Sequence, residues 1–264
     1  FFDSDQCAEL FNTVDQNNQI KPAKTPGMYL SDKNANLKHV LKIMELPCVD
    51  LKSIRTRGFK IAVDAVNGAG CEAIPLLLEN LGCNVVKINC DQNGVFNRGA
   101  EPLPENLGDL SGLVLREDCD LGFAVDPDSD RLAIVDENGK PLGEEYTLVL
   151  AAAGYLSQIE NSEILVTNLS SSIALDKIAD KYNSTVLRSA VGEINVVNKM
   201  IESNSNFGGE GNGGVILKDA HLGRDALVGA ALILSYLSQQ ETTLSETHKA
   251  LPQYVIVKDK INIK

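Results

Sequence analysis

The sequence lacks a basic surplus and a long hydrophobic run, and each absence excludes a class of protein. Lysine and arginine number 24 against 36 aspartates and glutamates, which gives a formal net charge of −12. Nucleic-acid binding depends on neutralising phosphates with basic side chains, so we predict no nucleic-acid partner. A membrane helix needs about 20 mainly apolar residues. The apolar stretch at 148–156 is much shorter, so we predict no membrane partner.

Paired cysteine motifs are also missing. The six cysteines are scattered without a C-x-x-C pair, and only three histidines could complete a zinc site. No signal peptide is recognisable, and the chain starts at Phe1 instead of Met, which suggests a piece of a longer protein. Because disulfides are rare in the cytosol, we predict reduced thiols and a cytoplasmic protein. With 264 residues, 44% hydrophobic and 23% charged, the chain has the composition of about two soluble domains.

The most informative segment is Asp126-Pro127-Asp128-Ser129-Asp130-Arg131, because three alternating carboxylates can converge on one hard cation. The apolar runs at 121–125 and 132–135 are typical of strands, so we expect a tight loop at a strand end. Carboxylates suit Mg²⁺, which is often held together with water and substrate phosphate oxygens. Arg131 adds a planar donor fork for phosphate. The alternative is a solvated acidic turn, since aspartate is common in turns.

A calcium-binding EF-hand loop is excluded for this segment. Its sixth position requires glycine for a sharp turn, and this chain has Arg131 there. An EF-hand also needs flanking helices, whereas the flanks here are typical of strands.

Alternating strand and helix patterns predict an α/β fold with two consecutive similar modules, each a mixed sheet flanked by helices. In the first module we expect strands at 59–63, 84–88, 121–125 and 132–135, and helices at 71–81 and 105–116. A helix at 144–158 is expected at the boundary, and the second module follows it with helices at 170–182 and 191–202 and strands at 163–167 and 185–187. Residues 1–36 do not show this alternation of strand and helix patterns, and they are assigned to the tail of a preceding domain and a linker.

Two further motifs have two interpretations each. Asn67-Gly68-Ala69-Gly70 could hold an anion on backbone amides or form a plain turn. Residues 207–216 contain five glycines around Glu210. Such a loop lets the backbone approach a sugar whose hydroxyls Glu210 would bind, or it is a flexible hairpin. Ser170-Ser171-Ser172 is expected to cap a helix, and Gly223-Arg224-Asp225 is expected to open another.

Together these motifs resemble the α-D-phosphohexomutases, the family of phosphoglucomutase, phosphomannomutase and phosphoglucosamine mutase. The similarity spans most of residues 37–262. It is carried by residues 63–70, 102–107, 126–131, 191–195, 209–213 and 223–225. Family members have four domains, so the resemblance implies a metal-binding second domain at 37–147 and a sugar-binding third domain at 148–264. The first and fourth domains of the parent chain would be missing partners.

The resemblance also implies a mechanism and a set of site residues. A phosphoserine would exchange phosphate with a hexose or hexosamine phosphate, interconverting the 1- and 6-phosphates through a bisphosphorylated sugar. Arg131 would be catalytic, beside the transferring phosphoryl group. Three carboxylates would bind Mg²⁺, namely Asp126, Asp128 and Asp130. Three residues of the glycine-rich segment would bind the sugar, namely Gly209, Glu210 and Asn212.

Departures from the family pattern leave alternatives open. No Ser-His-Asn triplet like the family's phosphoserine loop is present, and the C-terminal Arg-x-Ser-Gly-Thr phosphate clamp is absent, so we predict that the chain alone is inactive. Pro127, Asn212 and Gly214 leave phosphoglucosamine mutase and a phosphoglucomutase/phosphomannomutase both possible. One alternative is a non-catalytic sugar-phosphate-binding protein. Another is a phosphatase with Asp126 as nucleophile, which would need a lysine and further acids that the sequence does not identify.

Overall fold

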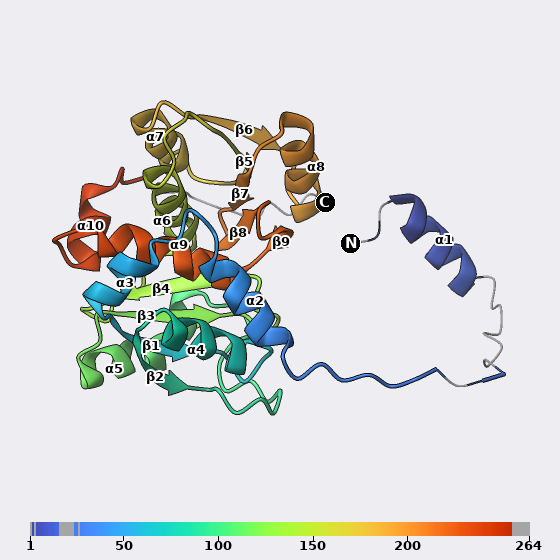
Figure 1. Cartoon of the computed structure of the whole chain (residues 1–264), viewed down its shortest axis with the longest axis horizontal. Helices are drawn as coiled ribbons and strands as arrows, with labels where there is room; N and C mark the ends of the chain where they lie inside the picture. Colours follow the sequence, from blue (N-terminus) through green and yellow to red (C-terminus); the bar gives the residue numbers. More distant parts are fainter. Residues whose placement is uncertain (1, 3, 16–23, 26, 255–264) are drawn as a thin grey trace, which may run out of the picture. The chain divides into compact units, whose positions relative to one another are not determined.

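The computed structural model of the chain describes residues 2, 4–15, 24–25 and 27–254. The chain divides into two compact units, Phe1–Lys33 and Asn34–Lys264. In the first unit the described residues form one helix, α1 (Ser4–Asp15), and much of the predicted linker lies outside the described residues. The other described helices and strands belong to the second unit (Figure 1). None of the described helices has the length and apolar character needed to cross a membrane.

The first half of the second unit is built on a four-stranded mixed sheet with the order β2-β1-β3-β4. Strand β1 is parallel to β2 and β3, and β4 is antiparallel to β3. The strands are β1 (Lys60–Asp64), β2 (Asn84–Ile88), β3 (Leu121–Val125) and β4 (Leu132–Asp136). The connection between the antiparallel pair, residues 126–131, is therefore a tight loop at the carboxyl end of β3.

Helices cover both faces of this sheet, as the alternation along β1 requires. Ala62 joins an apolar cluster with Leu110 and Val114 of α5, whereas Ile61 and Val63 belong to the larger cluster on the opposite face. Successive strand residues point to opposite faces, so both faces must be covered. The helices of this half are α2 (Ala35–Met44), α3 (Leu51–Arg57), α4 (Gly70–Asn80), the short 3-10 helix η1 (Pro104–Asn106) and α5 (Gly108–Glu117).

The second half repeats this topology and adds one strand. Its sheet has the order β6-β5-β7-β8-β9, with β5 parallel to β6 and β7, and antiparallel pairing of β7 with β8 and of β8 with β9. The strands are β5 (Ile164–Asn168), β6 (Thr185–Ser189), β7 (Phe207–Glu210), β8 (Gly214–Leu217) and β9 (His221–Arg224). The helices are α6 (Glu144–Ser157), α7 (Ala174–Lys181), α8 (Glu193–Ser203), α9 (Ala226–Ser238) and α10 (Leu244–Ala250).

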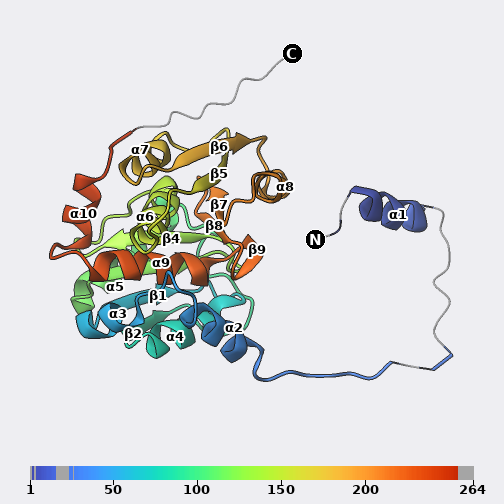
Figure 2. The ribbon, with the colours of Figure 1, turned by 45° about the horizontal axis from the view of Figure 1, so that its top comes forward.

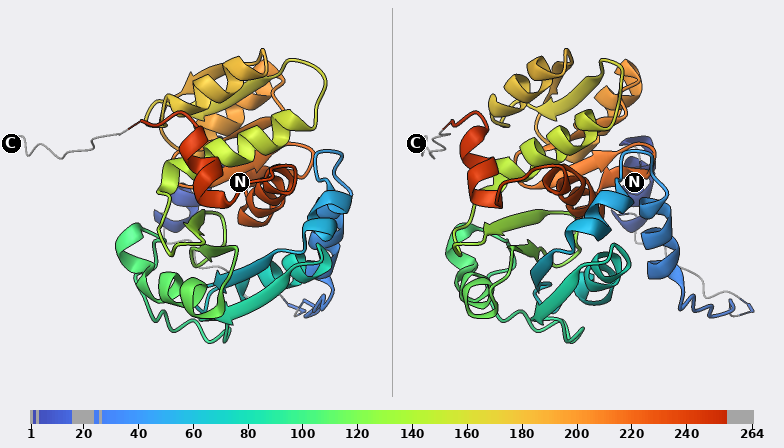
Figure 3. Two further views of the ribbon diagram at one scale, coloured as in Figure 1. Left: turned by 90° about the vertical axis from the view of Figure 1, so that its left-hand side faces the viewer. Right: turned by 60° about the vertical axis from the view of Figure 1, so that its left-hand side comes forward.

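Helices α6 and α9 lie between the two sheets, packed against each other and against β4 and β8 (Figures 2 and 3). Nearly all their residues are buried, as expected of helices that are apolar on every side. Gly154 marks the closest approach, since a Cβ there would lie 2.1 Å from the carbonyl oxygen of Leu232. The large apolar cluster consequently runs without a break from the first half into the second.

The predicted fold class is confirmed by the two related mixed sheets and their helices. One local expectation is wrong, because the helix expected from residue 170 begins at Ala174. The segment 223–225 does lead into a helix as expected, since Asp225 is the N-cap of α9, but its first two residues end the strand β9, which the sequence did not predict. The predicted domain boundary after residue 147 falls inside α6 and stays a prediction. The last ten residues of the predicted sugar-binding domain, 255–264, lie outside the described residues.

Candidate functional site

The carboxylate loop, residues 126–131, is shaped by Asp126. This aspartate is fully buried. Its Oδ1 accepts hydrogen bonds from the backbone N–H groups of Asp130 and Arg131, at 3.0 and 3.1 Å, and its Oδ2 lies 2.7 Å from Arg131 Nε. Burial, the largest influence, raises the pKa of Asp126, but the hydrogen bonds from the backbone and side chain of Arg131, together with its charge and a contact with the Asp130 side chain, outweigh it and lower the pKa overall. Asp126 therefore stays ionised and holds the loop closed.

The other two aspartates are less constrained. Oxygens of Asp126, Asp128 and Asp130 lie within 4.8 Å of one another, so the three carboxylates converge, and metal binding by them stays a prediction. Asp128 is exposed. Burial, followed by the charge of Asp126, raises the pKa of Asp130 to about 7. Crowding of three carboxylates is costly without a cation, because like charges disfavour ionisation.

Arg131 is held between two acids. Besides Asp126, it pairs with Glu101, whose two carboxylate oxygens face Nη1 and Nη2, the second at 2.9 Å. A guanidinium can form the same bidentate contact with a phosphate. A phosphate at Arg131 would thus compete with Glu101, which is about half exposed.

The segment Asn67–Gly70 supports the carboxylate loop instead of cradling an anion. Gly68 N–H donates to Ala65 O, and Ala69 N–H donates to Pro127 O at 2.8 Å. A Cβ on Gly68 would lie 2.5 Å from that same oxygen of Pro127. With these amides occupied, the turn interpretation of the motif is the one that the structure favours.

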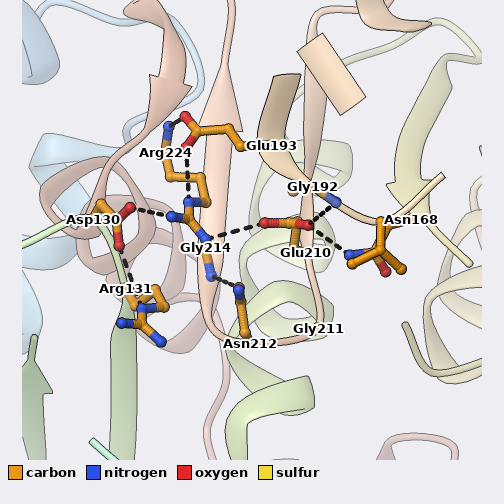
Figure 4. A network of polar contacts seen from close by, with 12 residues as sticks. Asp130, Arg131, Asn168, Gly192, Glu193, Glu210, Gly211, Asn212, Gly214 and Arg224 are labelled. Carbon is orange, nitrogen blue, oxygen red and sulfur yellow. Dashed lines mark hydrogen bonds and ion pairs between the residues drawn. The ribbon is translucent and has the colours of Figure 1, made fainter. Parts of the chain in front are cut away.

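Glu210 ends β7 and is buried, with 4% of its surface exposed. Its Oε1 accepts hydrogen bonds from Asn168 Nδ2 at 2.7 Å and from Gly192 N at 3.2 Å, and its Oε2 accepts one from Arg224 Nη1 at 3.0 Å. Figure 4 shows these donors converging on the carboxylate. An ionised carboxylate has about four acceptor positions, so about one remains for a further hydroxyl.

The glycine loop, residues 209–214, turns tightly next to Glu210. Gly213 has φ +92°, and a Cβ there would lie 2.5 Å from Leu132 O. Asn212 is partly exposed, and its Oδ1 accepts a hydrogen bond from Gly214 N at 3.2 Å. The loop is therefore the ordered turn of the β7–β8 hairpin, with Gly209 inside β7 and Asn212 at the tip.

Ser171 positions this loop and does not cap a helix. Its hydroxyl lies 2.7 Å from Thr167 Oγ1 and accepts a hydrogen bond from Gly211 N at 2.9 Å. Helix α7 starts only at Ala174, whose N–H donates to Ser172 Oγ at 3.1 Å. The serine triplet thus combines one cap-like contact with one contact to the glycine loop.

The carboxylate loop and the glycine loop are joined by their backbones. Leu132 N–H donates to Gly213 O at 3.1 Å, and Arg131 forms an antiparallel bridge with Gly214. The carboxylate loop also contacts α9, since Ala226 N–H at the start of that helix donates to Ser129 O at 3.1 Å. The two motifs, far apart in the sequence, therefore form a single surface at the junction of the two halves.

Arg224, at the end of β9, connects the two loops through its side chain (Figure 4). One guanidinium contacts three carboxylates: Glu210 at 3.0 Å, Glu193 at 3.1 Å and Asp130. All of these side chains are at most one-fifth exposed. Such enclosed pairs interact more strongly than surface pairs, so Arg224 fixes the position of Asp130 relative to Glu210.

Acidic groups outnumber basic groups in this surface. Two arginines, Arg131 and Arg224, face six carboxylates. The six are Glu101, Asp126, Asp128, Asp130, Glu193 and Glu210. An anionic ligand would be repelled by this arrangement, whereas a divalent cation would be attracted and could in turn attract phosphate.

Comparison with known proteins gives this site its context. The family model described as phosphoglucomutase/phosphomannomutase, alpha/beta/alpha domain II matches residues 37–139, and the model for domain III matches residues 143–255. The chain belongs to the phosphohexomutase family. This confirms the resemblance seen in the sequence motifs.

Among relatives of this phosphohexomutase chain, a phosphoglucomutase/phosphomannomutase of Thermococcus kodakarensis is 37% identical over 217 residues, covering 82% of this chain and 47% of the relative. A probable phosphoglucosamine mutase of Methanopyrus kandleri is 32% identical over 261 residues, covering 98% and 56%. A crystal structure of a phosphoglucomutase/phosphomannomutase family protein from Burkholderia thailandensis has a TM-score of 0.80 at 26% identity, covering 96% and 54%. The chain spans about half the length of these relatives.

The structure brings together all seven residues proposed from the phosphohexomutase resemblance, in two loops that share backbone contacts. Sequence reasoning assigned no role to Arg224, Glu193 or Asn168. The first two lie within motifs that carried the resemblance, but only the fold shows that they meet. Asn168 has no distinguishing sequence pattern beyond its place at a strand end.

Proposed function

We propose that this chain is the central part of a Mg²⁺-dependent phosphohexomutase that interconverts the 1- and 6-phosphates of a hexose or hexosamine. The observation that carries the proposal is the direct junction of the carboxylate loop and the glycine loop, bridged by Arg224. A ligand with a phosphate at one end and hydroxyls along its body matches such a surface, because one loop offers cation ligands and the other offers a hydroxyl acceptor.

The carboxylate loop fits Mg²⁺ as its cation. Asp126, Asp128 and Asp130 supply hard oxygen ligands within 4.8 Å of one another, and Asp130 Oδ1 is buried without a hydrogen bond. When bound there, Mg²⁺ would offset the negative charge of a transferring phosphoryl group. The residues of the loop would hold the cation at the carboxyl end of β3.

Each remaining residue has a positioning or binding role. Arg131 would donate hydrogen bonds to a phosphoryl group, in place of or beside its contact with Glu101. Glu210 would accept a hydrogen bond from a sugar hydroxyl at its remaining acceptor position, and Asn212 at the loop tip would contact the same sugar. Arg224 would keep the cation end and the sugar end at a fixed separation.

The phosphoryl carrier must come from outside this sequence. No Ser-His-Asn triplet is present, so we propose that a phosphoserine and a second phosphate anchor are supplied by further domains of a longer chain. The 264 residues alone are then inactive. The relatives include phosphoglucosamine mutases and a phosphoglucomutase/phosphomannomutase, and we propose a substrate within that group and a cytoplasmic location, in keeping with six unpaired cysteines.

Turnover by a four-domain parent chain tests this proposal. The assay contains Mg²⁺ and a catalytic amount of a hexose 1,6-bisphosphate, with glucosamine, glucose and mannose phosphates offered in parallel. We expect turnover of at least one sugar, loss of turnover in Asp128→Asn, and no turnover by the 264-residue chain. Binding of a sugar phosphate by the parent without any turnover would instead favour a non-catalytic binding protein, the alternative suggested by the missing serine motif.

A further inference from the structure

A second group of metal-binding side chains lies beside the proposed mutase site. His39 from α2, His221 from β9 and Asp225 at the start of α9 present ligand atoms that all lie within 4.8 Å of one another. His39 Nε2 is 2.7 Å and His221 Nε2 is 3.0 Å from the same Asp225 Oδ2. The residues come from three separate elements, so no sequence spacing reveals the group.

Hydrogen bonds hold the Asp225 side chain so that its Oδ2 faces both histidines. Its side chain is only 6% exposed, and its Oδ1 accepts hydrogen bonds from the N–H groups of Leu227 and Val228 at 2.8 and 3.2 Å. The cap fixes the carboxylate in place, and Oδ2 is left to face the two imidazoles. A carboxylate held by hydrogen bonds on its other oxygen is the supported type of ligand that metal sites use.

The two histidines leave the site open on one side. Their side chains are 33% and 45% exposed, and their ring centroids are 5.8 Å apart. In a tetrahedral zinc site with bonds near 2.0–2.1 Å, neighbouring ligand atoms lie about 3.3 Å apart. The two distances to Asp225 Oδ2, 2.7 and 3.0 Å, need to lengthen by only a few tenths of an ångström, and the ligand nitrogens of the two histidines lie within 4.8 Å of each other. The exposure of the histidines leaves the remaining position open to solvent.

One charge opposes cation binding. Lys42, one turn along α2 from His39, lies near enough to lower the pKa of that histidine, and its ammonium donates to the carbonyl oxygen of Ala220. Without a metal, His39 is paired with Asp225 by a hydrogen bond, which raises the pKa of His39 overall. A metal would displace protons from the histidines, as histidine ligands bind in the neutral form.

We propose that His39, His221 and Asp225 form a site for a borderline transition-metal ion of the Zn²⁺ class, with water in the fourth position. Two imidazoles and one carboxylate are ligands typical of zinc sites with an open position. The bound ion would tie α2 to the β9–α9 corner. Arg224 precedes Asp225 in that corner, so the ion would also stabilise the strand that carries the link between Asp130 and Glu210.

Metal titration of the 264-residue chain tests the site. Zn²⁺ affinity is measured near pH 7.5 by competition with a chromophoric chelator, in excess Mg²⁺, and Co²⁺ is added separately to record its visible absorption. We expect one Zn²⁺ per chain and the intense visible bands of four-coordinate Co²⁺. His39→Ala and His221→Ala should each weaken Zn²⁺ binding at least about tenfold, since loss of even a supporting residue typically costs 10–100-fold.

Two controls separate this site from other zinc-binding groups. His248→Ala removes the third histidine, which lies outside the group, and should leave affinity unchanged. Asp128→Asn impairs the carboxylate loop and should also leave it unchanged. Thermal melts of the metal-free variants show whether each is folded, and His221→Gln provides a milder replacement if His221→Ala is not.

The results that would overturn the proposal are specific. The first is the absence of Zn²⁺ binding by the chain. The second is a loss of Zn²⁺ affinity in His248→Ala as large as that in His39→Ala or His221→Ala. The third is loss of the bound Zn²⁺ in Asp128→Asn but not in His221→Gln. The last result would place the zinc in the carboxylate loop and leave the proposed mutase function untouched. Conversely, failure of mutase turnover in the parent chain would not affect a zinc site demonstrated in this way.

Discussion

Asp128→Asn is the sharpest perturbation of the carboxylate loop, because it alters one charge and almost no structure. Asp128 is exposed and forms no hydrogen bond or ion pair with the described residues, and asparagine has nearly the same shape. Asp126, by contrast, shapes the loop, and Asp130 pairs with Arg224. Loss of binding in either of those variants could reflect a collapsed loop, whereas loss in Asp128→Asn reports on the cation itself.

The expected magnitude follows from Coulomb's law. Two unit charges about 4 Å apart interact by roughly 1 kcal/mol in bulk water. An exposed carboxylate beside a divalent cation therefore contributes at least about 2 kcal/mol, which is a factor of about 30 in the Mg²⁺ dissociation constant. In the absence of Mg²⁺ the same substitution removes repulsion from Asp126 and Asp130. The metal-free variant should be as stable as the wild type or slightly more stable, because surface substitutions usually change stability by less than about 0.5 kcal/mol.

Isothermal titration with Mg²⁺ and thermal melts with and without Mg²⁺ measure both quantities. Asp91→Asn is a matched control, since it removes the same charge from another exposed loop, and it should change neither. An unchanged Mg²⁺ affinity in Asp128→Asn, or equal losses in both variants, would refute the assignment of the carboxylate loop as a specific cation site.

Three further variants test other parts of the structure. Glu101→Gln should tighten Mg²⁺-dependent binding of a sugar phosphate severalfold, because Arg131 loses its competing partner; weaker binding would show that Glu101 orients the arginine. Arg224→Met should lower the unfolding free energy by about 3 kcal/mol or more in denaturant titrations, since removing one partner leaves buried carboxylates unpaired, and a neutral result would contradict its bridging role. Burial raises the pKa of Glu137, but hydrogen bonds from Ser245 outweigh it, and the net pKa is lowered. Its contribution to stability is therefore present above the pKa of the unfolded chain and lost as pH falls through the folded value, so the stability difference between wild type and Glu137→Gln should shrink as pH falls below the ordinary glutamate pKa of about 4.5.

Local pattern was sufficient to predict most of the first module. The strand expected at 84–88 is β2, and the strand expected at 121–125 is β3, because short β-branched runs bounded by turns have few other stable conformations. The carboxylate loop followed from the same logic, since its aspartates stand between two such runs. In this part of the chain the sequence pattern and the tertiary packing favour the same structure.

Contacts between distant segments account for what the sequence did not reveal. Strand β9 has no alternating pattern of its own and exists because β8 offers it a pairing edge. Ser171 was expected to cap a helix, but Gly211, forty residues later, provides a donor for its hydroxyl. Arg224 likewise gains its role from three acids on different elements. Such long-range pairings depend on the fold, and no single local motif encodes them.

Nuclear magnetic resonance of the 264-residue chain tests the central claim, that the carboxylate loop and the glycine loop form one site. Amide shifts are followed while a hexose 1,6-bisphosphate is added with and without Mg²⁺. With Mg²⁺ present, the account predicts that amides of Asp128 to Arg131 and of Gly211 to Gly214 shift together with one apparent affinity, and that both responses weaken without Mg²⁺ or in Asp128→Asn. Shifts confined to one loop, or unaffected by Mg²⁺, would contradict it.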